Sequence, residues 1–341
     1  MASPDLHAAA RAGTLNQLPP DELSLEGLTA RNASGNTPLH VTAKHGHLDQ
    51  LPPGTLTADT LALKNDAGYT PLHHAAIGGH LDQIPPALLT AESLSVRSNA
   101  GYTVFHLATA NGHLPQVPAA LINASAFQNK NDVGNTPLHE AAEQGTLDHV
   151  PLEFVTAAAL AEKNLGGETV LHVAAFNGHL DQVPRAHLTA AALLEATSAG
   201  DTVFHAAAIS GHLGQIPFEL LTHHNLIGPS KAGFTAIHAA AETGQLDKIP
   251  PKQLSADLLL SRNDNGDTPL HAAAFEGHLN QIPPALLTAE AVSVRNYEGV
   301  SVWRIACDRG FENQIPPAGR PRQIGLFSRF FRQLFRPRAR F

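Results

Sequence analysis

The sequence contains a single cysteine, Cys307, among its 341 residues, and only 5% of the chain is aromatic. One cysteine excludes an internal disulfide framework and a structural zinc site built on several thiolates. No apolar run approaches the roughly 20 residues that a membrane-spanning helix requires. The first 17 residues lack the basic segment and the apolar segment of a secretory signal. Together these absences predict a cytoplasmic protein.

Basic residues are scarce over most of the chain. The formal charge is −8, yet residues 320–341 hold seven arginines and no acidic residue. The remaining residues therefore carry 15 basic against 30 acidic side chains, a net charge of −15. An acidic body repels the phosphate backbone of nucleic acids, so we expect no nucleic acid to bind along it. The 43% hydrophobic content is high enough for the chain to fold.

Histidine is abundant, with 21 residues, and nine of them recur at an interval of 33. A column of glycines has the same interval, and no unit contains an insertion. The columns are His7, His40, His73, His106, His139, His172, His205, His238 and His271, and Gly13, Gly46, Gly79, Gly112, Gly145, Gly178, Gly211, Gly244, Gly277 and Gly310. Units of constant length predict a repeat architecture in which each unit buries its apolar face against its neighbours.

One unit, residues 68–100, shows how the local sequence specifies structure. Thr70 suits the N-cap of a short helix, and Pro71 suits its first position, where the missing N–H is no loss. Gly79 suits the left-handed residue that ends this helix. Small side chains then occur where neighbouring first helices must touch, which lets the helices approach closely. These are Ala75, Ala76, Ala108, Ala141, Ala142, Ala174, Ala207, Ala240 and Ala273.

The motif Gly-x-Thr-Pro-Leu-His-x-Ala-Ala-x-x-Gly-His at this period resembles the ankyrin repeat. Clean copies occupy residues 35–47, 68–80 and 266–278, and the resemblance covers roughly residues 3–317. It implies an all-α, ankyrin-type helical solenoid of about ten 33-residue repeats, which we assign to residues 1–318. The first and last units depart from the motif, as expected for caps that meet solvent on one face.

The second half of each unit departs from the family. Ankyrin repeats carry one uninterrupted outer helix after Gly-His, whereas this chain has Pro-Pro pairs such as Pro85–Pro86. Proline forbids a helix from running through it, so we expect a second helix to begin at this pair. Residues 90–94 resemble a further capped start. We therefore predict a variant in which the outer helix is shifted or split into two short helices.

No residue pattern predicts catalysis. Residues 139–143 resemble the start of a zinc-protease His-Glu-x-x-His motif, but Glu143 stands where the second histidine is required. The column histidines are one repeat apart, far beyond the ~2 Å metal–nitrogen distance of a shared ion. The resemblance implies instead that they hydrogen-bond around the Thr-Pro-Leu-His turn. In the last unit, Cys307 stands at a position of the first helix where other units have alanine. This favours a role of Cys307 in packing. We expect no enzymatic activity, no cofactor and no metal site.

The resemblance also implies that partners are recognised by loop tips and the exposed side of the first helix. Residues at these positions vary between units while the framework repeats, which marks them as surface. The candidate partner-binding residues are Tyr69, Ile77, Tyr102, Asn111, Glu143, Phe176, Asn177, Ile209, Phe234, Glu242 and Phe275. Two interpretations of the aromatic and aliphatic members stay open: they line a semi-apolar groove, or each packs against the neighbouring repeat.

Residues 319–341 form a separate basic tail, predicted as a short C-terminal amphipathic helix between Pro321 and Pro337. Its candidate residues are Phe327, Arg329, Phe331, Arg332, Leu334, Phe335 and Arg336. Three interpretations stay open. The tail lies on an anionic membrane or in a partner's groove, it caps the last repeat with its arginines against the acidic body, or it is disordered.

These observations favour one function. We expect a monomeric, non-catalytic scaffold that binds an unidentified partner protein through the concave face and loop tips of the solenoid. The alternative is a membrane-peripheral adaptor that is anchored by the basic tail.

Overall fold

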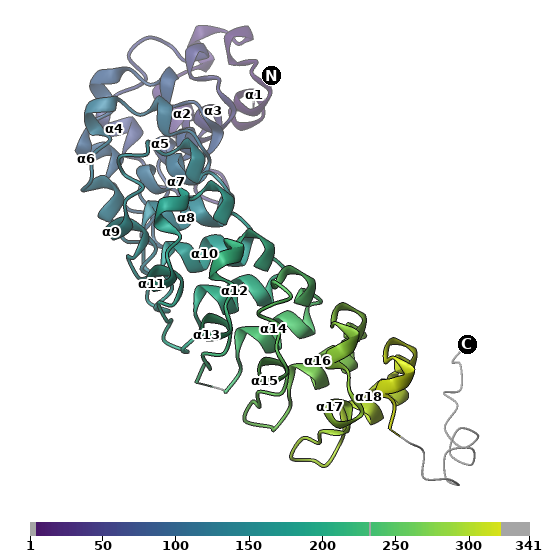
Figure 1. Cartoon of the computed structure of the whole chain (residues 1–341). Helices are drawn as coiled ribbons and strands as arrows, with labels where there is room; N and C mark the ends of the chain where they lie inside the picture. Colours follow the sequence, from purple (N-terminus) through teal and green to yellow (C-terminus); the bar gives the residue numbers. More distant parts are fainter. Residues whose placement is uncertain (1–4, 232, 322–341) are drawn as a thin grey trace, which may run out of the picture.

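The computed structural model describes residues 5–231 and 233–321 of the chain (Figure 1). These residues form an arc of helices in two rows. Figure 1 shows the longer helices side by side on the inner side of the arc and the shorter helices on its outer side. Within the described residues there are helices and isolated β-bridges but no strand, so the predicted all-α repeat fold is confirmed.

Each repeat begins with an inner helix of seven or eight residues. From α3 onward, consecutive inner helices begin 33 residues apart. The inner helices are α1 (Leu6–Ala12), α3 (Pro38–His45), α5 (Pro71–Gly78), α7 (Val104–Ala110), α8 (Pro137–Gln144), α10 (Val170–Asn177), α12 (Val203–Ile209), α14 (Ala236–Glu242), α16 (Pro269–Glu276) and α18 (Val302–Arg309). The domain boundary predicted at residue 318 falls inside the last described turn, Pro317–Gly319.

The ends of α5 follow the local sequence. The Thr70 side chain accepts the backbone N–H of His73, and the Thr70 N–H donates to His73 Nδ1 at 3.1 Å, which makes a reciprocal cap. Pro71 is the first helical residue, and Gly79 ends the helix with φ +78°. The ten glycines of the column have positive φ; seven of them are the C-cap of their inner helix, and in α7, α12 and α14 the glycine follows one residue after the C-cap.

The second half of each repeat contains no long outer helix, and the predicted split is confirmed. In the unit described above, Leu81–Gln83 is a 3₁₀ turn, Pro86–Leu88 is a second 3₁₀ turn, and α6 (Ala91–Leu94) is a single α-helical turn capped by Thr90. The prolines remove the N–H groups that a longer helix needs.

These elements recur along the described residues, although the units that begin with α3, α8 and α14 lack the second 3₁₀ turn and the turn Ala126–Gln128 replaces the short helix in the unit of α7. The short helices are α2 (Leu25–Thr29), α4 (Ala58–Leu61), α6 (Ala91–Leu94), α9 (Ala157–Leu160), α11 (Ala190–Leu193), α13 (His223–Leu226), α15 (Ala256–Leu259) and α17 (Ala289–Ser293). The first 3₁₀ turns are Leu15–Gln17, Leu48–Gln50, Leu81–Gln83, Leu114–Gln116, Leu147–His149, Leu180–Gln182, Leu213–Gln215, Leu246–Lys248, Leu279–Gln281 and Glu312–Gln314. The later ones are Pro20–Glu22, Pro86–Leu88, Ala119–Leu121, Ala126–Gln128, Arg185–His187, Phe218–Leu220, Pro284–Leu286 and Pro317–Gly319.

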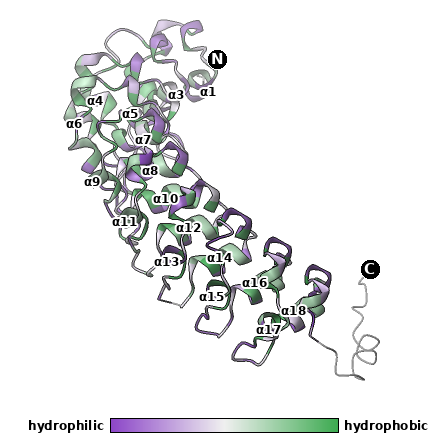
Figure 2. Cartoon of the chain, in the orientation of Figure 1, coloured by the Kyte–Doolittle hydropathy of each residue, from purple (hydrophilic) through white to green (hydrophobic). Residues whose placement is uncertain are grey.

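The core is a continuous strip between the two rows of helices. Each inner helix packs against the next one, and alanines such as Ala75, Ala108 and Ala174 at these contacts have no exposed surface. Leucines of the first 3₁₀ turns, among them Leu81 and Leu180, are also fully buried. Figure 2 shows the hydrophobic residues concentrated on the helices and the hydrophilic ones at the turns. Stacking therefore removes the apolar surface that a single repeat leaves exposed.

Glutamines join successive repeats through backbone groups. Gln83 Nε2 donates to the Gly46 carbonyl at 2.9 Å, while its Oε1 accepts the Leu48 N–H at 3.0 Å. The donor bond to a glycine 37 residues earlier recurs at Gln50, Gln116, Gln182, Gln215, Gln281 and Gln314. His149 and Lys248 interrupt this column, and in the second case Gln245 accepts the N–H of Leu213 at 2.7 Å. These bonds set the distance between repeats at the C-terminal ends of the inner helices.

Candidate functional site

The column histidines are structural. Nδ1 of His40 accepts the Thr37 N–H at 3.1 Å, so the proton of the neutral ring is on Nε2. Nε2 then donates to the carbonyl of Tyr69, in the next repeat, at 3.0 Å. The same bond to a carbonyl 29 residues later is made by His7, His73, His106, His139, His172, His205, His238 and His271. Each imidazole therefore fixes the loop tip of the next repeat.

Burial keeps these rings neutral. It lowers the pKa of His40, His73, His106 and His139 to about 4. Burial also lowers the pKa of His172, His205, His238 and His271, against the opposing charges of nearby carboxylates.

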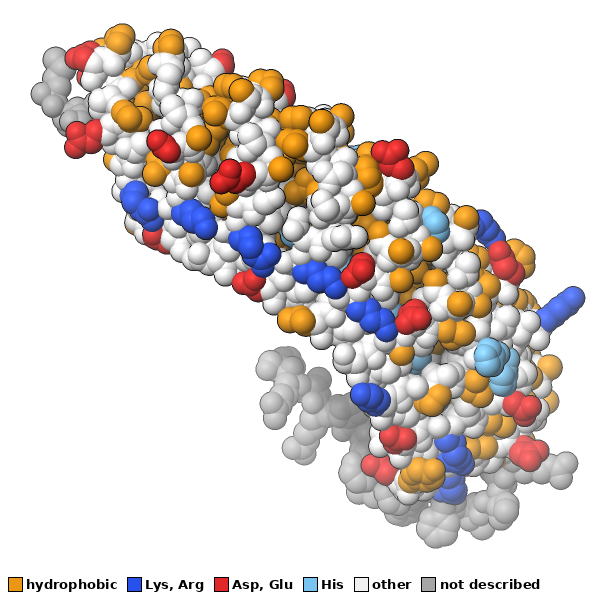
Figure 3. Space-filling view, turned by 90° about the vertical axis from the view of Figure 1, so that its left-hand side faces the viewer, with side chains coloured by type: hydrophobic (Ala, Val, Ile, Leu, Met, Phe, Trp, Pro, Cys, Tyr) orange, Lys and Arg blue, Asp and Glu red, His pale blue; other side chains and the backbone are white. Residues whose placement is uncertain are grey.

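A row of basic side chains along one edge was missed by the sequence analysis. Arg97 donates to the carbonyl of Lys130, 33 residues later, at 2.8 Å and pairs with Asp132 at 2.9 Å. Equivalent bonds start from Arg31, Lys64, Lys130, Lys163 and Arg262, and Figure 3 shows Lys and Arg side chains lined up along this edge. Most members of the row pair with a carboxylate, so the row strengthens the solenoid and offers little free positive charge. The basic residues of the row recur every 33 positions in the sequence, and this spacing could have predicted the row.

The three aromatic candidates at loop tips are partly buried. The ring of Tyr69 lies edge-on to His73 at 5.4 Å, and the ring of Tyr102 lies edge-on to His106 at 6.0 Å. Phe234 lies against His238 at 5.5 Å. All three pack against the core, as does Ile77 from α5. The tip aromatics thus cover the framework histidines of their own repeats.

The aromatic and aliphatic candidates at the ends of later inner helices are exposed. Phe176 in α10 is 54% exposed, and Ile209 in α12 and Phe275 in α16 are each 47% exposed. The guanidinium of Arg309 lies over the Phe275 ring at 3.4 Å from its centroid. Phe176 and Ile209 have no such covering group among the described residues.

The polar candidates occupy the same helix ends. Asn111 Nδ2 donates to the Leu107 carbonyl at 2.8 Å, and Asn177 Nδ2 donates to the Val173 carbonyl at 2.9 Å, so both amides close the last turn of their own helix. Glu143 and Glu242 are exposed. These two carboxylates therefore add negative charge to the inner surface.

The structure brings Phe176 and Ile209 together in one cavity. This cavity, of about 340 Å³, lies between the loop tips of two successive repeats and the helices α10 and α12. Glu168 and Asp201 contribute from the tips, and Ala206 and His172 from the helices. Of the lining residues, the sequence analysis had named only Phe176 and Ile209 as candidates. The sequence shows Glu168 and Asp201 at variable positions, but it does not show that both line this cavity.

A buried carboxylate lies one repeat earlier. Glu140 Oε1 accepts N–H groups from Asn131 and Asn135, both at 3.0 Å. Burial raises the pKa of Glu140, and burial followed by the charge of Glu140 raises the pKa of Tyr102 to about 12. In the zinc-protease-like residues 139–143, Glu140 is thus buried and hydrogen-bonded to two asparagines, whereas Glu143 is exposed.

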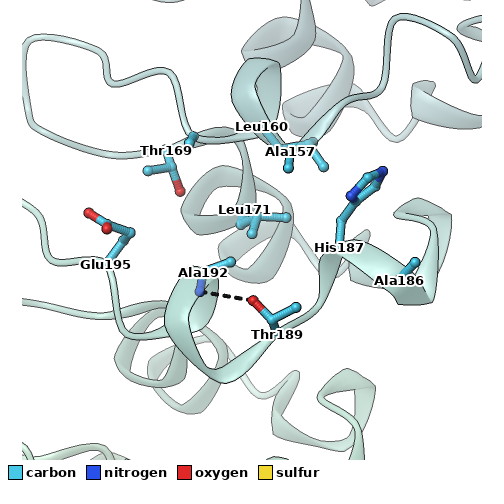
Figure 4. Close-up of a pocket in the computed structure, with 10 residues that line it drawn as sticks. Ala157, Leu160, Thr169, Leu171, Ala186, His187, Thr189, Ala192 and Glu195 are labelled. Atoms are coloured by element: carbon cyan, nitrogen blue, oxygen red, sulfur yellow. Dashed lines mark hydrogen bonds between the residues drawn. The ribbon is translucent and has the colours of Figure 1, made fainter.

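Two further cavities are less suited to a ligand. One of about 90 Å³ lies among the short outer elements, lined by alanines, Leu160 and Leu171, with Thr189 held by its bond to the Ala192 N–H (Figure 4). Another, of about 600 Å³, lies beside α1 and α2 with Asp21, Glu22 and Glu26 at its rim. Neither contains a candidate recognition residue.

Metal and membrane candidates were also searched over residues 5–231 and 233–321. No group of three or more His, Cys, Asp or Glu in these ranges is placed to hold a metal ion. None of the helices in the same ranges is long and apolar enough to cross a membrane. The predicted tail helix, with Phe327, Arg329, Phe331, Arg332, Leu334, Phe335 and Arg336, lies outside the described residues.

Stacked helix pairs joined by loop tips define the class of helical repeat solenoids that present an extended inner surface. A family model described as "Ankyrin repeats (3 copies)" matches residues 105–185 and 204–288. The chain belongs to the ankyrin-repeat family, in a variant whose second helix is interrupted by proline. A comparison with curated proteins found no match. Ankyrin repeats generally mediate protein–protein interaction and are typically not enzymes.

Proposed function

We propose that this chain is a non-catalytic scaffold that binds a partner protein through the inner surface of its central repeats, residues 143–276. The observation that carries the proposal is the cavity in which Phe176 and Ile209 stand about half exposed. Large exposed apolar side chains beside polar groups are typical anchors of interfaces. Phe176 and Ile209 do not belong to the buried core, so their exposed side chains are available for contact with a partner.

A paired substitution tests this proposal. We expect the Phe176→Ala, Ile209→Ala double variant to lose at least one protein that the full-length wild-type chain captures from cell extract. Its melting temperature should stay within about 2 °C, because exposed side chains contribute little to stability. Leu152→Ala is the matched control, since Leu152 is 74% exposed and lies outside the cavity. If the double variant retains every captured protein, the proposal is wrong.

The membrane-peripheral alternative rests on the composition of residues 320–341, with seven arginines and interspersed phenylalanines. The full-length chain would then sediment with anionic liposomes, and replacing these arginines by glutamine would abolish sedimentation. Unchanged sedimentation after this replacement would reject the alternative. We further infer a monomer that binds no nucleic acid along its acidic repeats, which analytical ultracentrifugation with and without duplex DNA tests.

A further inference from the structure

We propose that the cavity between α10 and α12 is a subsite for an arginine side chain of the partner. The occupant is an extended segment in which arginine is flanked by apolar residues. The inference rests on the proposed function and adds the chemical identity of the ligand.

The walls of the cavity suit the two ends of an arginine side chain. Phe176 and Ile209 supply apolar surface for the aliphatic stem, and Ala206 adds a small side chain to the lining. The carboxylates of Glu168 and Asp201 lie at the loop tips that line the same cavity. One Glu168 oxygen accepts Asn164 Nδ2 at 2.8 Å, which leaves the other oxygen available. Among the described residues, neither carboxylate forms an ion pair with lysine or arginine.

The chain itself shows how a guanidinium is bound in this column. Phe275 occupies the position of Phe176 three repeats later, and Arg309, 34 residues beyond it, stacks on its ring at 3.4 Å. The residue 34 positions beyond Phe176 is Ser210, whose hydroxyl donates to the Ala206 carbonyl at 2.6 Å. The Phe176 ring therefore lacks the cation that covers its equivalent. An arginine from a partner supplies that cation in trans.

The charge around the cavity favours a basic partner. Between residues 143 and 276, the loop-tip position and the two positions before each column glycine include no lysine or arginine. Six of these positions are acidic: Glu143, Glu168, Asp201, Glu242, Asp267 and Glu276. An extended basic segment that runs along the inner surface of these repeats meets a favourable potential at every repeat.

Arginine fits this subsite better than an apolar or acidic side chain. Covering the cavity with apolar surface alone would take two carboxylates out of water without a partner, which is costly. The planar guanidinium stacks on an aromatic ring and donates to carboxylates in the same geometry.

Selection from a random peptide library displayed on phage tests the inference, with the full-length chain as target. We expect enrichment of peptides in which arginine neighbours leucine, isoleucine, valine or phenylalanine. In the best peptide, citrulline in place of that arginine removes the charge and should weaken binding at least tenfold. Phe176→Ala and the Glu168→Gln, Asp201→Asn double variant should weaken binding of the arginine peptide similarly. Glu153→Gln, an exposed carboxylate outside the groove, is the control and should bind as the wild type does.

The outcomes separate this inference from the proposed function. Peptides that depend on Phe176 and Ile209 but tolerate citrulline would overturn the arginine subsite and leave groove recognition intact. Peptides that are indifferent to both residues, or no enrichment at all, would overturn both. If binding appears only after the six arginines of residues 322–341 are replaced by glutamine, the occupant is the chain's own terminus and the proposed partner is wrong.

Discussion

The inner surface has two stretches that share one framework and differ in chemistry. In residues 11–111, the tip and helix-end positions carry Arg11 and Lys44 but no acidic residue. In residues 143–276, the same positions carry six acidic residues and no lysine or arginine, with Phe176, Ile209 and Phe275 exposed among them. The histidine and glutamine bonds beneath both stretches are nearly unchanged. The framework therefore leaves these positions free to specify a partner.

The comparison extends below the surface to the histidines. In the first stretch, burial lowers the pKa of His40 and His73, hydrogen bonds to backbone groups oppose this shift, and the charges of Arg31 and Lys64 add to it, so that each pKa is about 4. In the second stretch, burial also lowers the pKa of His172 and His205, but Glu168 and Asp201 oppose that shift. The acidic residues at the loop tips thus affect the titration of the framework histidines near them.

Acidification should produce the largest effect and should distinguish the two stretches. A histidine whose pKa is lower in the folded state adds stability that is present above its unfolded pKa of about 6.5 and is lost as the pH falls toward 4. The loss reaches about 3 kcal/mol for each ring with a folded pKa of about 4. We expect hydrogen exchange at pH 7.5 and 4.5, corrected for intrinsic rates, to show greater loss of protection in α3, α5 and α7 than in α12, α14 and α16. Equal or greater loss in the later helices would contradict the assigned difference.

A glycine pair in the two stretches gives the next largest effect. Gly79 has φ +78°, and a Cβ there would lie 2.7 Å from Nε2 of His113, whose ring bonds the Ala76 carbonyl at 2.8 Å. Gly211 has φ +90°, but nothing lies within 4 Å of its Cβ position. Backbone strain costs about 1 kcal/mol in either case. We expect Gly79→Ala to cost about 2–3 kcal/mol and Gly211→Ala about 1 kcal/mol by urea denaturation. Equal costs would show that the histidine ring moves aside freely.

The framework was predictable from the sequence because its residues recur at a constant spacing of 33. The spacing of histidine and glycine, the Thr-Pro cap and the Pro-Pro interruption predicted the repeats, the helix ends and the split outer helix. The basic row starting at Arg31 and the glutamine column starting at Gln50 have the same period and were equally readable. They were missed because only two columns and the alanines were followed.

The candidate site was predictable only in part. The sequence identified the variable positions but not which side chains stay exposed. Phe234 and Phe176 are the same residue type, yet a tip position lies over the histidine of its own repeat, whereas a helix-end position opens to solvent. The cavity is also lined by residues of two successive repeats, which the sequence of one repeat cannot reveal.

A smaller effect is expected where the two stretches meet. Burial raises the pKa of Glu140, so its ionised form reduces stability at neutral pH. Glu140→Gln keeps an oxygen for Asn131 and Asn135 and removes the charge, so it should raise the melting temperature at pH 7. The gain should shrink toward pH 4, because a carboxyl whose folded pKa is raised loses stability only as the pH rises through its unfolded value. Glu153→Gln, an exposed carboxylate that does not contribute to this shift, should leave the melting temperature unchanged at both pH values.

The substitution with the smallest expected effect on stability is the most direct test of the arginine subsite. Ser210→Arg places a guanidinium where Arg309 lies over Phe275, so it should cover the Phe176 ring within the chain. A cation–π contact at an exposed site is worth about 0.5–1 kcal/mol, and the new charge also faces Glu168 and Asp201. We expect a rise in melting temperature of about 1–2 °C together with at least tenfold weaker binding of an arginine-containing peptide. Ser210→Gln has similar reach without the charge and should change neither value by as much. If Ser210→Arg leaves peptide binding intact, the cation site over Phe176 is not where the partner binds, and the equivalence between Phe176 and Phe275 is purely geometric.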